Sequence, residues 1–225
     1  MSRVLALVEG QTEQAFVKQV LAPELSARGV FLTAALIGKP GRKGGIRPYE
    51  IVRGDILRLL KQDRQQFCTT MLDYYGLPAG WPGKAGGRGS PSSLAEHIEQ
   101  AMRDDVAAAM GEGFTPTRFI PYIQMHEFEA LLFSDPGVLA GVLDVPGLAE
   151  TLQGIIAQCG EPERIDDSPE GAPSKRISQH SRRYNKVVHG TIAAQRIGLT
   201  RMRDRCPHFA AWLGGLGHLG SAAPG

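Results

Sequence analysis

Acidic side chains follow three separate apolar segments of this sequence. Glu9 comes directly after the first such segment, Asp73 directly follows the third, and Glu127 and Glu129 come shortly after the fourth. Carboxylate oxygens are the ligands that Mg²⁺ and Mn²⁺ prefer in proteins. When such segments are neighbouring parallel strands, the residues after them meet at one edge of a sheet. The pattern therefore predicts a divalent-metal site at that edge.

Further polar residues beside these positions have more than one interpretation. Glu13 lies about one helical turn after Glu9 and either adds a metal ligand or complements the positive end of a helix dipole. Glu127 and Glu129 flank an apolar stripe on opposite sides, so we expect only one of them to reach the site. His126 has the chemistry of a base, a metal ligand or a substrate contact, but we favour a helix cap or a buried hydrogen bond.

The segments between these residues alternate between strand and helix patterns. Parallel strands that alternate with helices along a chain are joined by right-handed crossovers. We therefore expect an α/β fold with a mostly parallel sheet of about four strands flanked by helices. We expect strands at 4–8, 30–37, 67–72 and 118–123, and helices at 12–28, 48–62 and 93–110.

The second half of the chain lacks a strand pattern. From about Pro136 it reads as short helices joined by Gly and Pro. No linker-like break in the apolar pattern occurs near Asp135, so we expect an α/β core over 1–135 and a helical C-terminal extension over 136–225 packed on that core.

Basic residues are concentrated in two stretches, although the net charge of the 225-residue chain is only +2. Such segregation either presents a basic face to a polyanion or forms ordinary solvated helix faces. The candidate phosphate contacts are Arg42, Lys43, Arg47, Lys175 and Arg176. Contacts of this kind give salt-dependent binding to nucleic acid that is largely independent of base sequence.

Several other classes of protein are disfavoured by motif and composition. Neither a GxSxG nor a GxxxxGK[ST] motif occurs, so a serine hydrolase or P-loop nucleotide-hydrolysing site is not indicated. The three cysteines show no CxxC spacing, which disfavours structural zinc or a disulfide framework. The first apolar run is too short for a membrane span or signal peptide, and we expect a cytoplasmic protein without membrane contact.

Beyond these residue-level arguments, several motifs resemble a known family. VEGQTE after the first strand, with an acidic residue after a later strand, resembles the TOPRIM fold of topoisomerases, primases and overcoming-lysogenization-defect (OLD) nucleases. More narrowly, a set of motifs across nearly the whole chain resembles a family of small prokaryotic proteins catalogued as a TOPRIM-like domain of unknown function. These motifs are VEGQTEQAF, MLDYYGLP, FIPYIQMHEFEALLFSDP, APSKRI and RMRDRCPHFAAWL.

The resemblance implies roles for two of the acidic residues. Glu9 corresponds to the TOPRIM glutamate, which acts as general acid or base and helps to hold metal. Asp73 corresponds to the first residue of the usual Asp-x-Asp pair. The second position is Tyr75, which is not a carboxylate. Therefore either Glu13, Glu127 or Glu129 completes the set of carboxylate ligands around the metal, or the site does not cleave nucleic acid.

Together these arguments predict metal-dependent hydrolysis of phosphodiester bonds in nucleic acid. Glu9, Asp73 and Glu127 are the candidate catalytic residues, Mg²⁺ or Mn²⁺ is the expected cofactor, and Glu13 and Glu129 are further candidate ligands. The resemblance also implies association with an ATPase in anti-phage defence. The alternatives are a catalytically inactive docking subunit of such an ATPase, or the same chemistry on a nucleotide or RNA end.

Overall fold

A single parallel sheet organises the chain in the computed structural model, which describes residues 1–38, 48–165 and 171–221. Its strands run in the order β2-β1-β3-β4, and β5 also pairs with β3. Every pairing is parallel. This confirms the predicted α/β class. The strands are β1 Ser2–Val8, β2 Val30–Leu36, β3 Phe67–Asp73, β4 Phe119–Ile120 and β5 Ile123–Gln124.

The described residues form five strands where about four were expected, because the strand predicted at 118–123 is split in two. Pro121 lies between β4 and β5 and has no N–H to donate to a strand ladder. At this break, the side-chain hydroxyl of Thr70 in β3 forms hydrogen bonds with the backbone of Tyr122. It accepts a hydrogen bond from Tyr122 N at 2.9 Å and lies 3.0 Å from Tyr122 O.

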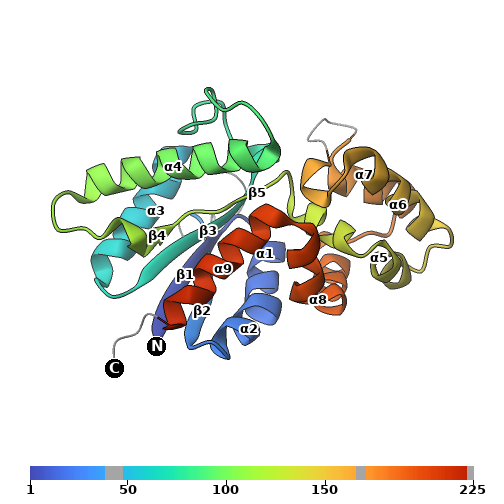
Figure 1. Cartoon of the computed structure of the whole chain (residues 1–225), viewed down its shortest axis with the longest axis horizontal. Helices are drawn as coiled ribbons and strands as arrows, with labels where there is room; N and C mark the ends of the chain where they lie inside the picture. Colours follow the sequence, from blue (N-terminus) through green and yellow to red (C-terminus); the bar gives the residue numbers. More distant parts are fainter. Residues whose placement is uncertain (39–47, 166–170, 222–225) are drawn as a thin grey trace.

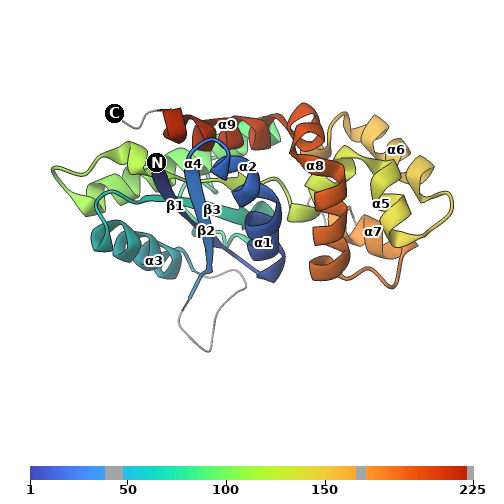
Figure 2. The ribbon, with the colours of Figure 1, turned by 90° about the horizontal axis from the view of Figure 1, so that it is seen from below.

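Helices cover both faces of the sheet (Figures 1 and 2). Successive strand residues point to opposite faces, so β1 contributes Ala6 to one buried cluster and Leu7 to the other. The Leu7 face packs against α3 Tyr49–Gln62 and α4 Pro91–Met110. The Ala6 face packs against α1 Gln11–Phe16, the π-helical turn η1 Val17–Leu21, α2 Ala22–Ser26 and α9 Pro207–Ser221.

From Pro136 onward, the described residues form helices joined by short loops. Helices α5, α6 and α7 lie beyond one end of the sheet, and α9 runs back across its face (Figure 1). Phe209 and Trp212 of α9 share one buried cluster with Val4 of β1. The helices are α5 Pro136–Leu143, α6 Leu148–Cys159, α7 Pro173–His180 and α8 Thr191–Arg205, with shorter turns η2 Tyr74–Gly76, η3 Pro116–Arg118, η4 Phe128–Ser134, η5 Pro162–Arg164 and η6 Lys186–Gly190.

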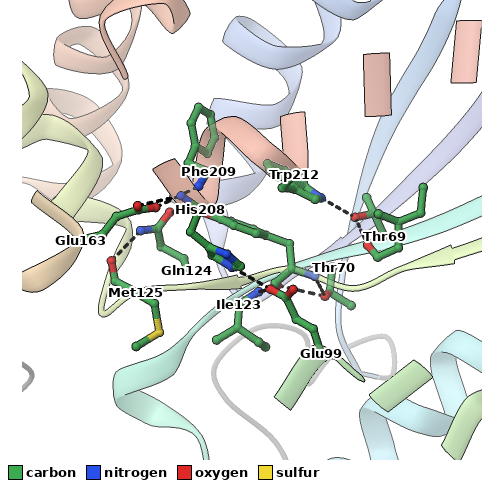
Figure 3. A network of polar contacts seen from close by, with 12 residues as sticks. Thr69, Thr70, Glu99, Ile123, Gln124, Met125, Glu163, His208, Phe209 and Trp212 are labelled. Atoms are coloured by element: carbon green, nitrogen blue, oxygen red, sulfur yellow. Dashed lines mark hydrogen bonds and ion pairs between the residues drawn. The ribbon is translucent and has the colours of Figure 1, made fainter. Parts of the chain in front are cut away.

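A buried polar network ties the start of α9 to the rest of the fold (Figure 3). The Glu163 carboxylate accepts hydrogen bonds from the backbone N–H groups of His208 and Phe209, both at 2.9 Å. These are first-turn N–H groups that the helix itself leaves without partners. Glu163 of η5 therefore acts as a distant cap for α9.

Two side chains of α9 extend this network to the strands and α4. His208 Nε2 lies 2.8 Å from Glu99 Oε1, and the same oxygen accepts a hydrogen bond from Ile123 N at 2.9 Å. Trp212 Nε1 donates to Thr69 Oγ1 of β3 at 2.9 Å (Figure 3). The C-terminal helix thereby fixes the strands whose ends carry the acidic residues.

None of the helices in the described ranges is both long enough and apolar enough to cross a membrane.

Candidate functional site

The carboxyl ends of β1 and β3 are adjacent, since these strands pair in parallel with Val8 beside Met71. Glu9 directly follows β1, and Asp73 is the last residue of β3. Burial and the charge of Glu13 raise the pKa of Glu9, and Lys186 and a backbone hydrogen bond from Asp73 lower it by less. The predicted meeting of these two strand ends is therefore present.

Glu13 reaches the same place from the first helix. Its side chain is buried, and its charge raises the pKa values of both Glu9 and Asp73. Gly10 makes room for it, because a Cβ atom there would lie only 2.9 Å from Glu13 Oε2.

Asp73 connects the strand end to the turn η4. Its Oδ1 accepts a hydrogen bond from Phe128 N at 2.9 Å, and its Oδ2 lies 3.7 Å from Lys186 Nζ. Nearby, Tyr75 N donates to His126 O at 3.0 Å. The segment that carries Glu127 and Glu129 is thus held against the end of β3 by backbone contacts.

Glu127 and Glu129 have different partners. Glu127 accepts hydrogen bonds from Ser174 N at 2.8 Å and Ser174 Oγ at 3.0 Å, at the start of α7. Glu129 is fully buried and accepts a hydrogen bond from the Tyr184 hydroxyl at 3.2 Å. Sequence periodicity predicted an apolar helical stripe around them, but the segment forms a 3-10 turn whose residues 128–134 are all buried.

Lys186 is the residue that sequence reasoning missed. It lies in the second basic stretch, but nothing in its local spacing marked it as part of a site. In the structure its Nζ lies 3.0 Å from Glu129 Oε2, as well as 3.7 Å from Asp73 Oδ2. One ammonium group therefore pairs with two carboxylates from different elements.

The pKa values at the site follow from burial and crowded negative charge. Burial is the largest cause that raises the pKa of Asp73 well above its ordinary value, and Glu13, Glu9 and Glu129 raise it further, against Lys186. Burial likewise raises the pKa values of Glu9 and Glu129. Burial alone would lower the pKa of Lys186, but Asp73 and Glu129 outweigh it and the net shift is upward. Such a site favours an added cation.

The donor set suits a hard divalent cation, because it consists of carboxylate oxygens. In the described part of the chain, Glu9 Oε2 is buried and has no hydrogen-bond partner. However, no three His, Cys, Asp or Glu side chains among the described residues converge closely enough to hold a metal ion.

The remaining candidate residues lie around this cluster. Lys175 is exposed and Arg176 half-buried in the first turn of α7, next to the residue that Glu127 binds. His126 is buried with its ring edge-on to Tyr74, at 5.6 Å between centroids. Tyr75 is 43% exposed, so its ring does not take the place of a buried carboxylate. Arg42, Lys43 and Arg47 lie outside the described residues.

Comparison with known proteins gives one match. Residues 8–217 match the family model described as "Domain of unknown function (DUF4276)". No curated protein and no solved structure matches the chain.

Proposed function

Because the chain belongs to the DUF4276 family, whose description states no activity, we propose its function from the site: metal-dependent hydrolysis of phosphodiester bonds in nucleic acid, on a fold related to TOPRIM. The observation that carries this proposal is that the charges of Glu13, Glu9 and Glu129 all act on the buried carboxylate of Asp73 at the end of β3. The VEGQTE segment, which runs from the end of β1 into α1, supports the relation to TOPRIM.

In this proposal, Glu9, Asp73 and Glu129 would hold Mg²⁺ or Mn²⁺ once their side chains turn toward one another, because no three such side chains converge in the described residues, and Glu13 would support them from α1. When bound, such an ion would polarise the scissile phosphate and activate a water molecule. Glu9, at the end of β1, would be the group that accepts a proton from that water. Glu127 contributes by positioning α7 through Ser174 rather than as a first ligand.

Lys175 and Arg176 would contact substrate phosphates from α7, together with Arg42, Lys43 and Arg47 of the 39–47 segment. Such contacts involve the charged phosphates rather than the base edges. Binding would therefore weaken as the salt concentration rises and would depend little on base sequence.

The second candidate function is an inactive subunit that docks on an ATPase, and exposed apolar side chains favour it. Tyr75, Val187 and Val188 are 43%, 38% and 51% exposed, and they flank the site residues Asp73 and Lys186 in sequence. Exposed apolar side chains beside a site are typical of a surface that a partner covers.

The test is calorimetric titration of Mg²⁺ and Mn²⁺ into the wild type and Asp73→Asn, followed by incubation with single- and double-stranded DNA and RNA. Asparagine keeps an oxygen that can accept the Phe128 N–H but removes the charge. Glu112→Gln serves as the control, because Glu112 is exposed and follows α4.

We expect metal binding and cleavage in the wild type and in Glu112→Gln, and loss of both in Asp73→Asn. Metal binding without cleavage of any of the four substrates would speak against hydrolysis of nucleic acid. Absence of both activities in the wild type, with stable co-purification of an ATPase, would favour the docking subunit.

A further inference from the structure

The two edges of the described sheet differ in how they are protected from pairing with another strand. At one edge, β4 and β5 have two residues each, and Pro121 lies between them. Short edge strands and proline are devices by which proteins prevent such pairing. At the other edge, β2 runs for seven residues, and its sequence VFLTAAL contains neither proline nor a charged residue. The β2 edge therefore lacks these devices.

The outer side of β2 presents backbone hydrogen-bonding groups. In the described residues β2 pairs only with β1, and Ser2 N donates to Gly29 O at 3.0 Å where this pairing begins. Because the direction alternates along a strand, the N–H and C=O groups of odd-numbered β2 residues face β1 and those of even-numbered residues face outward. Gln14 Nε2 donates to Ala34 O at 3.5 Å, which agrees with this alternation. Such an outward row of donors and acceptors is what an added strand pairs with.

One face of β2 also exposes an aromatic side chain. Phe31 lies beyond the cluster that α3 and α4 cover and is 45% exposed, and Thr33 on the same face is exposed as well. Strand β2 lies at the lower edge of the sheet in Figure 1 and on its near side in Figure 2. A strand added at this edge would cover Phe31.

The residues of β2 are complementary to a second copy of β2 in one register. If two copies pair antiparallel with Thr33 opposite Thr33, every residue of β2 has a partner, and the outward groups form about eight hydrogen bonds. This register places Phe31 opposite Ala35 on the exposed face. It places Leu32 opposite Ala34 on the other face, so a large side chain meets a small one on both faces.

We propose that two copies of this chain associate through β2 in this register, about a two-fold axis at Thr33, so that their sheets join into one. A second copy fits this edge because the same strand supplies the matching donors and acceptors and the small residues opposite Phe31 and Leu32. The contact is isologous, since each copy offers the same surface. It requires neither metal nor nucleic acid, so it is independent of the proposed function.

Disulfide crosslinking tests the register. The two Thr33 residues would form a pair without mutual hydrogen bonds, with Cα atoms about 4.5 Å apart, which a disulfide can span. Thr33→Cys should therefore crosslink two full-length chains when oxidised glutathione is added. Ala35→Cys, on the same face, is the matched control, because two cysteines there would lie about 14 Å apart. Both variants also carry Cys159→Ser, because Cys159 is only half-buried whereas Cys68 and Cys206 are buried.

Sedimentation equilibrium tests the association without a crosslink. We expect the wild type to form a dimer with a dissociation constant below about 100 μM. Thr33→Lys should raise that constant at least about tenfold, because it places two ammonium groups directly opposite each other. Thr33 is exposed, so this change leaves the core of each copy intact. Gln62→Lys adds the same charge at an exposed position of α3 and should change the constant less than about threefold.

A Thr33→Cys crosslink without an Ala35→Cys crosslink, together with weaker association of Thr33→Lys, would support the proposal. A wild type that stays monomeric at about 100 μM would overturn it, including the case in which a strand of another protein covers β2. A dimer that Thr33→Lys leaves intact, or one that crosslinks through Ala35→Cys and not through Thr33→Cys, would overturn it as well. Cleavage of nucleic acid is measured separately, so its absence would bear on the proposed function alone.

Discussion

Replacement of His208 by leucine should destabilise the fold strongly, because it leaves the buried Glu99 carboxylate without its cation. His208 Nε2 lies 2.8 Å from Glu99 Oε1, with side chains only 5% and 7% exposed. Removal of one partner from a buried ion pair costs about 3–5 kcal/mol. Ile123 N still donates to Glu99, so we expect the lower end, about 3 kcal/mol.

The contribution of this pair should also depend on pH. Burial alone lowers the pKa of His208, but its hydrogen bond with Glu99 and the charges of Glu99, Glu163 and Glu96 outweigh burial and raise it above 6.5. A folded-state pKa above the unfolded value means that the folded protein holds the proton more tightly. The ion pair therefore stabilises the fold fully below about pH 6.5, and this stabilisation is lost as pH rises through the folded-state pKa of His208.

The assay is urea unfolding of the wild type, His208→Leu and the charge-free double variant Glu99→Gln/His208→Gln, between about pH 6 and 9, where unfolded carboxylates are already ionised. The double variant keeps polar groups but has no ion pair. The free-energy advantage of the wild type over it should shrink as pH rises through this window. A constant or growing advantage would refute the reasoning, as would a loss below about 1 kcal/mol for His208→Leu at pH near 6.

Two glycine substitutions test other parts of the structure. Gly220→Ala should lower the free energy of unfolding by about 2 kcal/mol or more, because its Cβ would overlap the backbone oxygen of Arg28; an unchanged urea midpoint would show that α9 does not pack there. Gly10→Ala should cost less than about 1 kcal/mol, because its Cβ meets only the movable end of Glu13, yet calorimetry should show weaker Mn²⁺ binding; unchanged affinity would exclude Glu13 from the site.

The local pattern of the sequence was sufficient to predict the sheet and part of the site. Apolar runs of strand length separated by helical periodicity imply parallel strands, and the carboxyl ends of parallel strands lie at one edge. Glu9 directly follows β1 and Asp73 ends β3, so their proximity could be predicted without knowledge of distant contacts. Pro121 was the local signal that the last strand would divide, and the prediction of one strand at 118–123 did not use it.

Partners that come from far along the chain were decided only by tertiary structure. Lys186 and Tyr184 reach Glu129 from the second half, and Ser174 reaches Glu127. Helical or strand periodicity reports which face of its own element a residue occupies, and carries no information about which distant side chain packs opposite it. The sequence by itself therefore determined where the carboxylates gather, and the packing of the C-terminal helices decided which of them pair with Lys186, because only folding brings those segments together.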